Sequence, residues 1–234
     1  MRKWMLAVAA AVFVLPARAD VKLPNLFSDG MVLQQGKKCK FWGTAESGEF
    51  VNVALDLGKE GHAINVETNK DGKWSADLPA LKAGGPYTLT IKGKNEIVLK
   101  DVYVGEVWVC SGQSNMEWSL KNSFNPADDI KNSKNPKIRL FTVKKTASDT
   151  PQSDVPRDKV NGQWLECNPD TVPGFSAVAY YFGRDLQKAL DVPVGLIHTS
   201  WGGTASEEWT SRRCWTSTPS TRASIRGRRS STTA

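Results

Sequence analysis

The segment Val109–Trp118 reads Val-Cys-Ser-Gly-Gln-Ser-Asn-Met-Glu-Trp and places Ser114 on a glycine-containing turn. An alternating apolar run, Val102–Val109, precedes this turn and predicts a strand, so the turn joins a strand to the start of a helix. The backbone N–H groups at the start of a helix can donate hydrogen bonds to a negatively charged group. Acyl transfer requires such donors, because they stabilise the oxyanion that forms on the carbonyl oxygen. The chemistry predicted here is nucleophilic attack by the Ser114 hydroxyl on an acyl carbonyl.

The same residues support a purely structural alternative. Ser114-x-x-Glu117 fits a capping box, in which the serine hydroxyl accepts a hydrogen bond from the third N–H of the helix. The pattern Ser-x-x-Glu is common at helix starts, so this short motif by itself leaves both interpretations open.

A second glycine turn, Gly202-Gly203, follows the apolar run Val194–Thr199, which predicts a buried strand. Thr204-x-x-Glu207 is another candidate capping box, so this turn also leads toward a helix. Two units of strand, glycine turn and helix in one parallel sheet place both turns at its carboxyl edge, where ligands bind in open α/β folds. We therefore expect Ser114 and Gly202-Gly203 to share one site.

The remaining pattern divides the chain. Residues 20–100 show short alternating segments separated by turn residues, which predicts an antiparallel β-sandwich. The predicted strands there are Lys38–Thr44, Phe50–Leu57, Ala63–Thr68, Lys73–Leu78, Tyr87–Ile91 and Glu96–Lys100.

Residues 101–211 alternate strand and helix, which indicates a partial α/β sheet domain. Ile138–Val143 is a further predicted strand, and Ser176–Leu190 is a predicted amphipathic helix. Its predicted apolar side consists of Val178, Tyr181, Phe182, Leu186 and Leu190. The stretch 121–164 reads as loops over the sheet with one strand in it.

The first nineteen residues, Met1–Ala19, have the basic start, apolar middle and Ala-Arg-Ala end of a bacterial-type secretory signal peptide. The alternative is an uncleaved anchor. We expect cleavage before Asp20, no membrane span afterwards, and a periplasmic or secreted mature chain.

The net charge of +7 is concentrated at the ends of the chain. Three basic residues lie in 1–19 and six in 212–234, with no acidic residue in either range, so residues 20–211 carry a net charge of −2. The body of the protein therefore gives no electrostatic case for nucleic acid binding.

The four cysteines, Cys39, Cys110, Cys167 and Cys214, are too few and too scattered for a disulfide scaffold. Because the sequence contains no Cys-x-x-Cys pair and no histidine cluster with metal-ligand spacing, we expect no metal, and no cofactor is implied. We interpret Cys110, which ends an apolar strand, as a buried small residue rather than a second nucleophile.

The composition changes after Ser211. Residues 212–234 contain ten Ser or Thr and only scattered apolar positions, which predicts a disordered basic tail. We interpret this tail as the product of a lost reading frame near Arg212, with a genuine basic tail as the alternative.

Gly105–Trp118 closely resembles the nucleophile block of sialate O-acetylesterases, carbohydrate esterases of the SGNH hydrolase superfamily. The resemblance extends from Leu23–Gln34 through Gly84–Tyr87 to Ser200–Thr204 and Glu208–Ser211. It implies an α+β multidomain fold: an antiparallel β-sandwich followed by a partial SGNH-hydrolase-like three-layer sheet domain. The chain is then an amino-terminal fragment of such an enzyme.

The resemblance implies roles for several residues. Ser114 is the nucleophile, and its own N–H is one oxyanion donor. The second donor is Gly202 or Gly203, with Gly203 preferred because it precedes Thr204. Gln113, Asn115, Trp118 and Trp201 are the implied substrate-binding residues. The tryptophans, together with Trp209, have an alternative role as ordinary packing residues.

The catalytic base is missing from this pattern. The family supplies it from a carboxyl-terminal Asp-x-x-His, which this sequence lacks, and only His62 and His198 are present. We interpret His62 as a surface residue and His198 as a packed strand histidine, with a catalytic role for His198 as the alternative.

The predicted function is removal of O-acetyl groups from sialic acid or a related acetylated glycan, with an acetylated sugar as the expected substrate; the sequence leaves the oligomeric state open. We expect this chain to be inactive or nearly so. An acetylxylan-type esterase and a non-catalytic glycan-binding protein are the alternatives.

Overall fold

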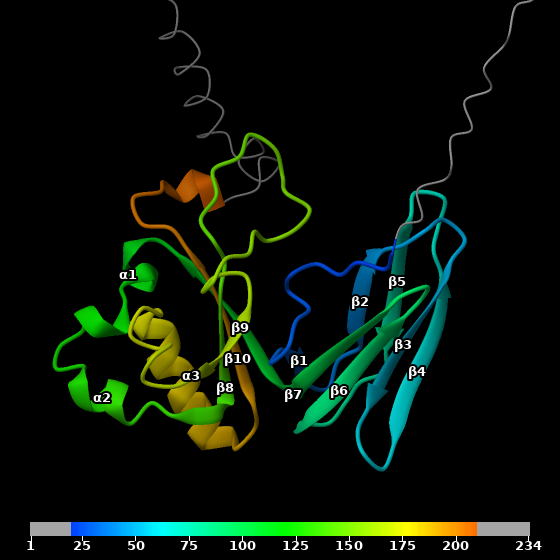
Figure 1. Ribbon diagram of the computed structural model, residues 1–234. Helices are drawn as coiled ribbons and strands as arrows, with labels where there is room; N and C mark the ends of the chain where they lie inside the picture. The colour runs from blue at the N-terminus through cyan, green and yellow to red at the C-terminus, as the bar shows by residue number, and fades with distance from the viewer. Residues whose placement is uncertain (1–19, 210–234) are drawn as a thin grey trace, which may run out of the picture.

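The computed structural model describes residues 20–209, so the expected signal peptide, 1–19, and the expected tail, 212–234, lie outside the described residues. The described chain is dominated by mixed β-sheet and has few helices (Figure 1). Its strands are β1 (Val32–Gln34), β2 (Cys39–Thr44), β3 (Phe50–Asp56), β4 (Gly61–Glu67), β5 (Lys73–Leu78), β6 (Gly84–Lys92), β7 (Glu96–Gly112), β8 (Asn135–Thr142), β9 (Trp164–Cys167) and β10 (Val194–Ser200). Its helices are α1 (Ser114–Glu117), α2 (Ala127–Lys131) and α3 (Ala177–Leu190), with 3-10 turns η1 (Leu120–Asn122) and η2 (Ser206–Trp209).

Strand β1 pairs in parallel with β7, and the strands from β2 to β6 form antiparallel pairs. β3 pairs with β4 and β6, β6 pairs with the first half of β7, and β2 and β5 form a separate two-stranded sheet. Side chains along β2 alternate between buried and exposed, as the period of a half-buried strand requires. Phe41 and Ala76 of the smaller sheet share one apolar core with Val53 and Leu89 of the larger sheet.

The predicted strands Glu96–Lys100 and Val102–Val109 are one continuous strand, β7, which runs from the antiparallel region into the parallel one (Figure 1). Asp101 adopts a positive φ of 59° in the middle of β7, and its carboxylate pairs with the nearly buried Arg139 of β8 at 2.6 Å. The division that we predicted between residues 100 and 101 therefore falls inside a strand, and the division itself stays a prediction.

The carboxyl-terminal half of β7 pairs in parallel with β10, and β10 pairs in parallel with β8. The predicted strands Ile138–Val143 and Val194–Thr199 are thus present as β8 and β10. The stretch 121–164 contains α2 and the first residue of β9 besides β8. Sequence reasoning missed both because they span only five and four residues and the burial of β9 does not alternate.

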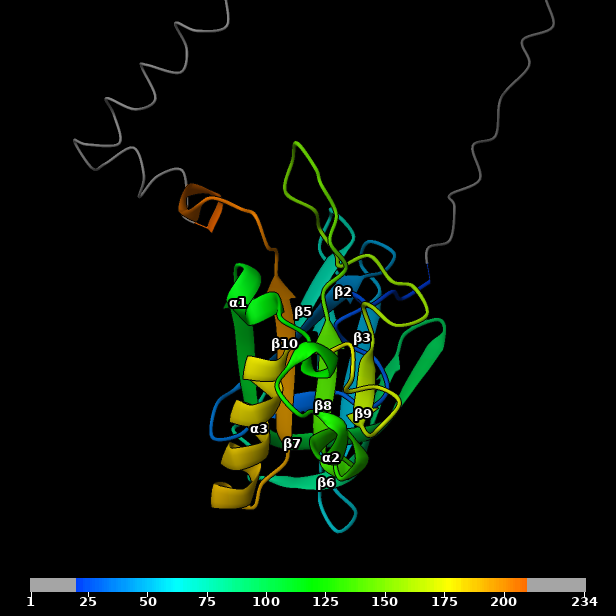
Figure 2. The same ribbon diagram turned by 90° about the vertical axis from the view of Figure 1, so that its left-hand side faces the viewer.

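The predicted helix Ser176–Leu190 is confirmed as α3, with Ser176 as its N-cap. The predicted apolar side is wrong in part: Val178, Phe182 and Leu190 are 48 %, 41 % and 49 % exposed. The buried residues are Ala177, Ala179, Tyr180, Gly183 and Gln187. Gly183 explains the difference, because a Cβ added there would lie 2.5 Å from Cδ1 of Leu196. The helix packs against β10 (Figure 2), and at Gly183 the contact is so close that any side chain there would clash with Leu196.

In the part of the chain that the structure describes, no helix is long and apolar enough to cross a membrane. Cys39, Cys110 and Cys167 are buried free cysteines.

Candidate active site

The two glycine turns meet at the carboxyl edge of the parallel strands. Gly112, the last residue of β7, is in register with Ser200, the last residue of β10, and the N–H of Trp201 donates to the Gly112 carbonyl at 2.9 Å. Figure 2 shows α1 beside the end of β10. The turn that carries Ser114 and the turn that carries Gly202 therefore leave the sheet side by side, as the strand pattern predicted.

Ser114 is the first residue of α1 and is exposed. The N-cap of α1 is Gln113, and no side chain caps this helix. Among the described residues, no hydrogen bond involves the Ser114 hydroxyl. The capping-box interpretation is therefore wrong for Ser114, and its hydroxyl is left available for another partner.

Glu117 also departs from the capping-box pattern, because its carboxylate does not return to the start of its own helix. One oxygen accepts from the backbone N–H of Gly202, and the other accepts from Nζ of Lys145, just beyond β8. The hydrogen bond from Lys145, followed by that from Gly202, lowers the pKa of the Glu117 carboxyl from its ordinary value. Residues that follow three neighbouring strands thus meet at one carboxylate.

The two glycines of the second turn differ. A Cβ added at Gly202 would lie 2.9 Å from Oε2 of Glu117 and 3.5 Å from Cβ of Ser114, so a side chain at this position would crowd the site. At Gly203 a Cβ would meet nothing, so space does not require glycine there. Its positive φ of 80° does favour glycine, because other residues rarely adopt this conformation.

A cavity of about 610 Å³ lies beside Ser114. It is lined by Ser114, Glu117, Trp118, Ser119, Lys121, Asn122, Thr142, Lys145, Gly174, His198 and Gly202. Among the predicted site residues, Ser114, Gly202 and Trp118 line this cavity. Gln113, Asn115, Gly203 and Trp201 are not among its lining residues.

The two tryptophans flank this region at the surface. Trp118 is 55 % exposed, and its indole N–H donates to the Asn122 carbonyl at 3.0 Å. Trp201 is 37 % exposed, and Nζ of Lys145 lies 5.9 Å from the centre of its ring. Both side chains present ring surface to solvent.

His198 borders the cavity but is buried within β10. Its Nε2 is hydrogen-bonded to Oγ of Ser200, its ring packs edge-on against Phe175 at 5.4 Å, and its Nδ1 has no partner within the described residues. Burial lowers the pKa of the His198 imidazole, which favours the neutral ring near pH 7. These contacts fit a packed strand histidine. His62 lies on β4, the strand at the far end of the large sheet.

Sequence reasoning missed Lys121 and Lys145, because both fall in the stretch that we interpreted as loops. For Lys145 a usable signal was present: it comes shortly after a parallel strand, β8, and such positions reach the same sheet edge as Ser114.

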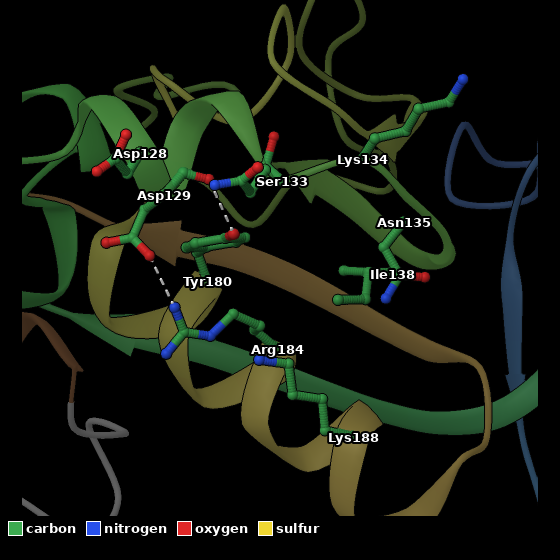
Figure 3. A pocket seen from close by; sticks show the side chains of 10 residues that line it. Asp128, Asp129, Ser133, Lys134, Asn135, Ile138, Tyr180, Arg184 and Lys188 are labelled. Carbon is green, nitrogen blue, oxygen red and sulfur yellow. Dashed lines mark hydrogen bonds and ion pairs between the residues drawn. The ribbon is translucent and has the colours of Figure 1, made fainter.

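A second cavity, of about 210 Å³, lies between α2 and α3 (Figure 3). Asp129 and Arg184 point toward each other across it and form an ion pair at 2.9 Å, and Tyr180 donates to the Asp129 carbonyl at 3.4 Å. Its central charges, Asp129 and Arg184, pair with each other, and its lining residues include neither Ser114 nor the glycine turn.

Comparison with known proteins points to one family. A family model described as "Carbohydrate esterase, sialic acid-specific acetylesterase" matches residues 104–224. This match extends into the Ser- and Thr-rich segment 212–234. The sialate O-acetylesterase of Rattus norvegicus is 33 % identical over 197 residues, covering 78 % of this chain and 36 % of that protein. The human sialate O-acetylesterase is 31 % identical over 207 residues, covering 82 % of this chain and 39 % of that protein.

A solved structure agrees with these relatives. The crystal structure of a carbohydrate acetylesterase from Xanthomonas citri superimposes with a TM-score of 0.77 at 34 % identity, covering 82 % of this chain and 43 % of that chain. The chain thus spans less than half the length of the relatives that it matches. Because the family model covers more than half of its residues, including Ser114 and Gly202-Gly203, this chain belongs to the carbohydrate esterase family of sialic acid-specific acetylesterases.

Proposed function

We propose that this chain carries the nucleophile part of a serine esterase that removes O-acetyl groups from sialic acid or related acetylated glycans. The observation that carries the proposal is the position of Ser114. This residue packs against Gly202 and lines an open cavity, and its hydroxyl forms no hydrogen bond within the described residues. Family membership and the names of the relatives support this choice of reaction.

In the proposed reaction, Oγ of Ser114 attacks the acetyl carbonyl, and the carbonyl oxygen becomes an oxyanion. Collapse of this intermediate breaks the bond to the sugar oxygen, which leaves with a proton, and the acetyl group stays on Ser114 until water releases it as acetate. The proposed oxyanion donors are the N–H groups of Ser114 and Gly203. We place Gly202 second because its N–H already donates to Glu117.

The proposed site lacks an evident base to accept the proton of the Ser114 hydroxyl. The sequence has no Asp-x-x-His, and His198, the one histidine beside the cavity, has Nε2 bonded to Ser200. We therefore propose that turnover of p-nitrophenyl acetate by the 234-residue chain is close to the uncatalysed background. Hydrolysis well above background that Ser114→Ala abolishes would overturn this part of the proposal.

Cysteine substitution tests the nucleophile without relying on a base. A thiol has a pKa of about 8.5 and ionises near neutral pH far more readily than a hydroxyl. We expect Ser114→Cys to be acetylated by p-nitrophenyl acetate at least about tenfold faster than Ser119→Cys, since a single oxyanion donor is worth about 10²-fold or more. Ser119 is the matched control because it lines the same cavity. The unsubstituted chain, with its native cysteines, gives the background, and equal rates for the two variants would refute the proposal.

The substrate class is tested separately by ligand-observed NMR on Ser114→Ala, which cannot turn substrate over. We expect binding of O-acetylated sialic acid in preference to acetylated xylo-oligosaccharide, with loss of binding in Trp118→Ala. Binding of the xylan fragment alone would replace the proposed substrate. Binding of glycans without regard to acetylation, combined with no acylation of Ser114→Cys, would favour a non-catalytic binding protein.

We further propose that the fold comprises an antiparallel β-sandwich and a partial SGNH-hydrolase-like three-layer domain. The shared core of the two antiparallel sheets and the separate core around α3 support this arrangement.

We also propose that the chain is exported to the periplasm or secreted and begins at Asp20. The signal-like sequence of Met1–Ala19 supports this proposal. Mass spectrometry of exported material tests it, and an intact Met1–Ala19 segment there would contradict it.

A further inference from the structure

The carboxylate of Glu117 joins segments that follow three strands of the sheet. Glu117 lies on α1, one helical turn after Ser114. It accepts from the N–H of Gly202, which follows β10, and from Nζ of Lys145, which follows β8. Among the side-chain hydrogen bonds of the described residues, this carboxylate is the one group that links α1, which carries Ser114, to the Gly202-Gly203 turn.

The link bears on the oxyanion donors. Gly202 and Gly203 are consecutive, so the placement of the Gly202 N–H constrains the peptide unit that carries the Gly203 N–H. Gly202 also fits closely against Ser114, as the 3.4 Å from its ideal Cβ position to Cα of Ser114 shows. A carboxylate held in this contact fixes the distance between the nucleophile and the turn that supplies the second donor.

The contact is a charge-assisted hydrogen bond, which is stronger than a neutral one. Yet the Glu117 and Lys145 side chains are 34 % and 40 % exposed, and solvent-exposed ion pairs contribute little to stability. The arrangement therefore affects the geometry of the site more than the free energy of unfolding.

We propose that Glu117 is a positioning residue for acyl transfer, which anchors the Gly202-Gly203 turn against Ser114 through the Gly202 N–H. This inference rests on the proposed function of Ser114. Glu117 itself does not touch the reacting atoms and acts through the backbone that it holds.

The first measurement is independent of activity. In ¹⁵N-labelled chain, the Gly202 amide proton should resonate downfield, as expected for an N–H bonded to a carboxylate, and Glu117→Leu should shift it upfield. Glu117→Gln, whose amide oxygen still accepts, should give an intermediate shift. A Gly202 resonance that is the same in all three proteins would overturn the proposed contact.

The second measurement uses the Ser114→Cys background. Glu117→Leu in this background should lower the rate of acetylation by p-nitrophenyl acetate by about tenfold relative to Ser114→Cys alone. Glu117→Gln in the same background should keep the rate within about threefold of Ser114→Cys alone. Lys144→Gln is the matched control, since Lys144 forms an exposed ion pair with Asp158 and does not contact Glu117. Thermal melts verify that the variants remain folded.

The two proposals fail in different ways. If Ser114→Cys is not acetylated faster than its own control, the proposed function fails, and the inference about catalysis fails with it even if the Gly202 shift is present. If Ser114→Cys reacts as expected and Glu117→Leu reacts equally fast, the proposed function stands and the positioning role of Glu117 is refuted.

Discussion

Replacing Ser176, the N-cap of α3, tests whether the helix beside the site is held as the structure shows. Oγ of Ser176 accepts from the N–H of Ala179 at 3.1 Å, and the two residues are 0 % and 1 % exposed. Ser176→Ala would leave that N–H buried and unpaired. Loss of a cap costs about 1 kcal/mol, and an unsatisfied buried donor costs about 1–3 kcal/mol, so we expect a loss of about 2 kcal/mol.

Ser28 provides the matched control. It is also buried, at 8 % exposure, but its hydroxyl has no hydrogen-bond partner within the described residues. Ser28→Ala therefore removes a group that forms no hydrogen bond, and we expect a change within about 0.5 kcal/mol or a slight gain in stability.

Urea unfolding followed by circular dichroism measures both free energies, and thermal melts provide a second measure. A loss of about 2 kcal/mol corresponds to a fall in Tm of about 4–8 °C for a chain of this size. If the free energies of unfolding of Ser176→Ala and Ser28→Ala differ by less than about 0.5 kcal/mol, the cap does not stabilise α3 as argued.

Three further predictions concern the site and its supporting strands. Ser114→Ala should change the free energy of unfolding by less than about 0.5 kcal/mol, because the exposed Ser114 hydroxyl caps nothing; a loss of 1 kcal/mol or more in urea unfolding would restore the capping interpretation. Gly105→Ala should lower the free energy of unfolding by more than about 3 kcal/mol, since its Cβ would lie 2.0 Å from the Pro193 carbonyl oxygen. The control Gly48→Ala, strained only by a φ of 76°, should lower it by about 1 kcal/mol. Similar unfolding midpoints for the two variants would contradict this. Burial raises the pKa of the Cys110 thiol to about 11, so at pH 8 the thiolate fraction falls to about 0.1 %; peptide mapping should find Cys110 alkylated by iodoacetamide only after unfolding, and rapid native labelling would refute its burial.

The residue pattern alone determined the local elements. The period-2 alternation of segments such as Lys73–Leu78 located the antiparallel strands, and apolar spacing with a capping serine located α3. Two strands that each end in a glycine turn were sufficient to predict that Ser114 and Gly202 meet, because parallel strands end at the same edge of a sheet.

The tertiary structure decided the contacts that depend on distant neighbours. The sequence periodicity of α3 does not show that Leu196 fills the space over Gly183, and this close packing selects which side of the helix faces the sheet. In the same way, Ser114-x-x-Glu117 fits a local cap in sequence, yet Glu117 binds Gly202, 85 residues away. A short motif fixes which groups can form hydrogen bonds, but which partners they meet depends on strand order and register, because these set the distances between segments far apart in the chain.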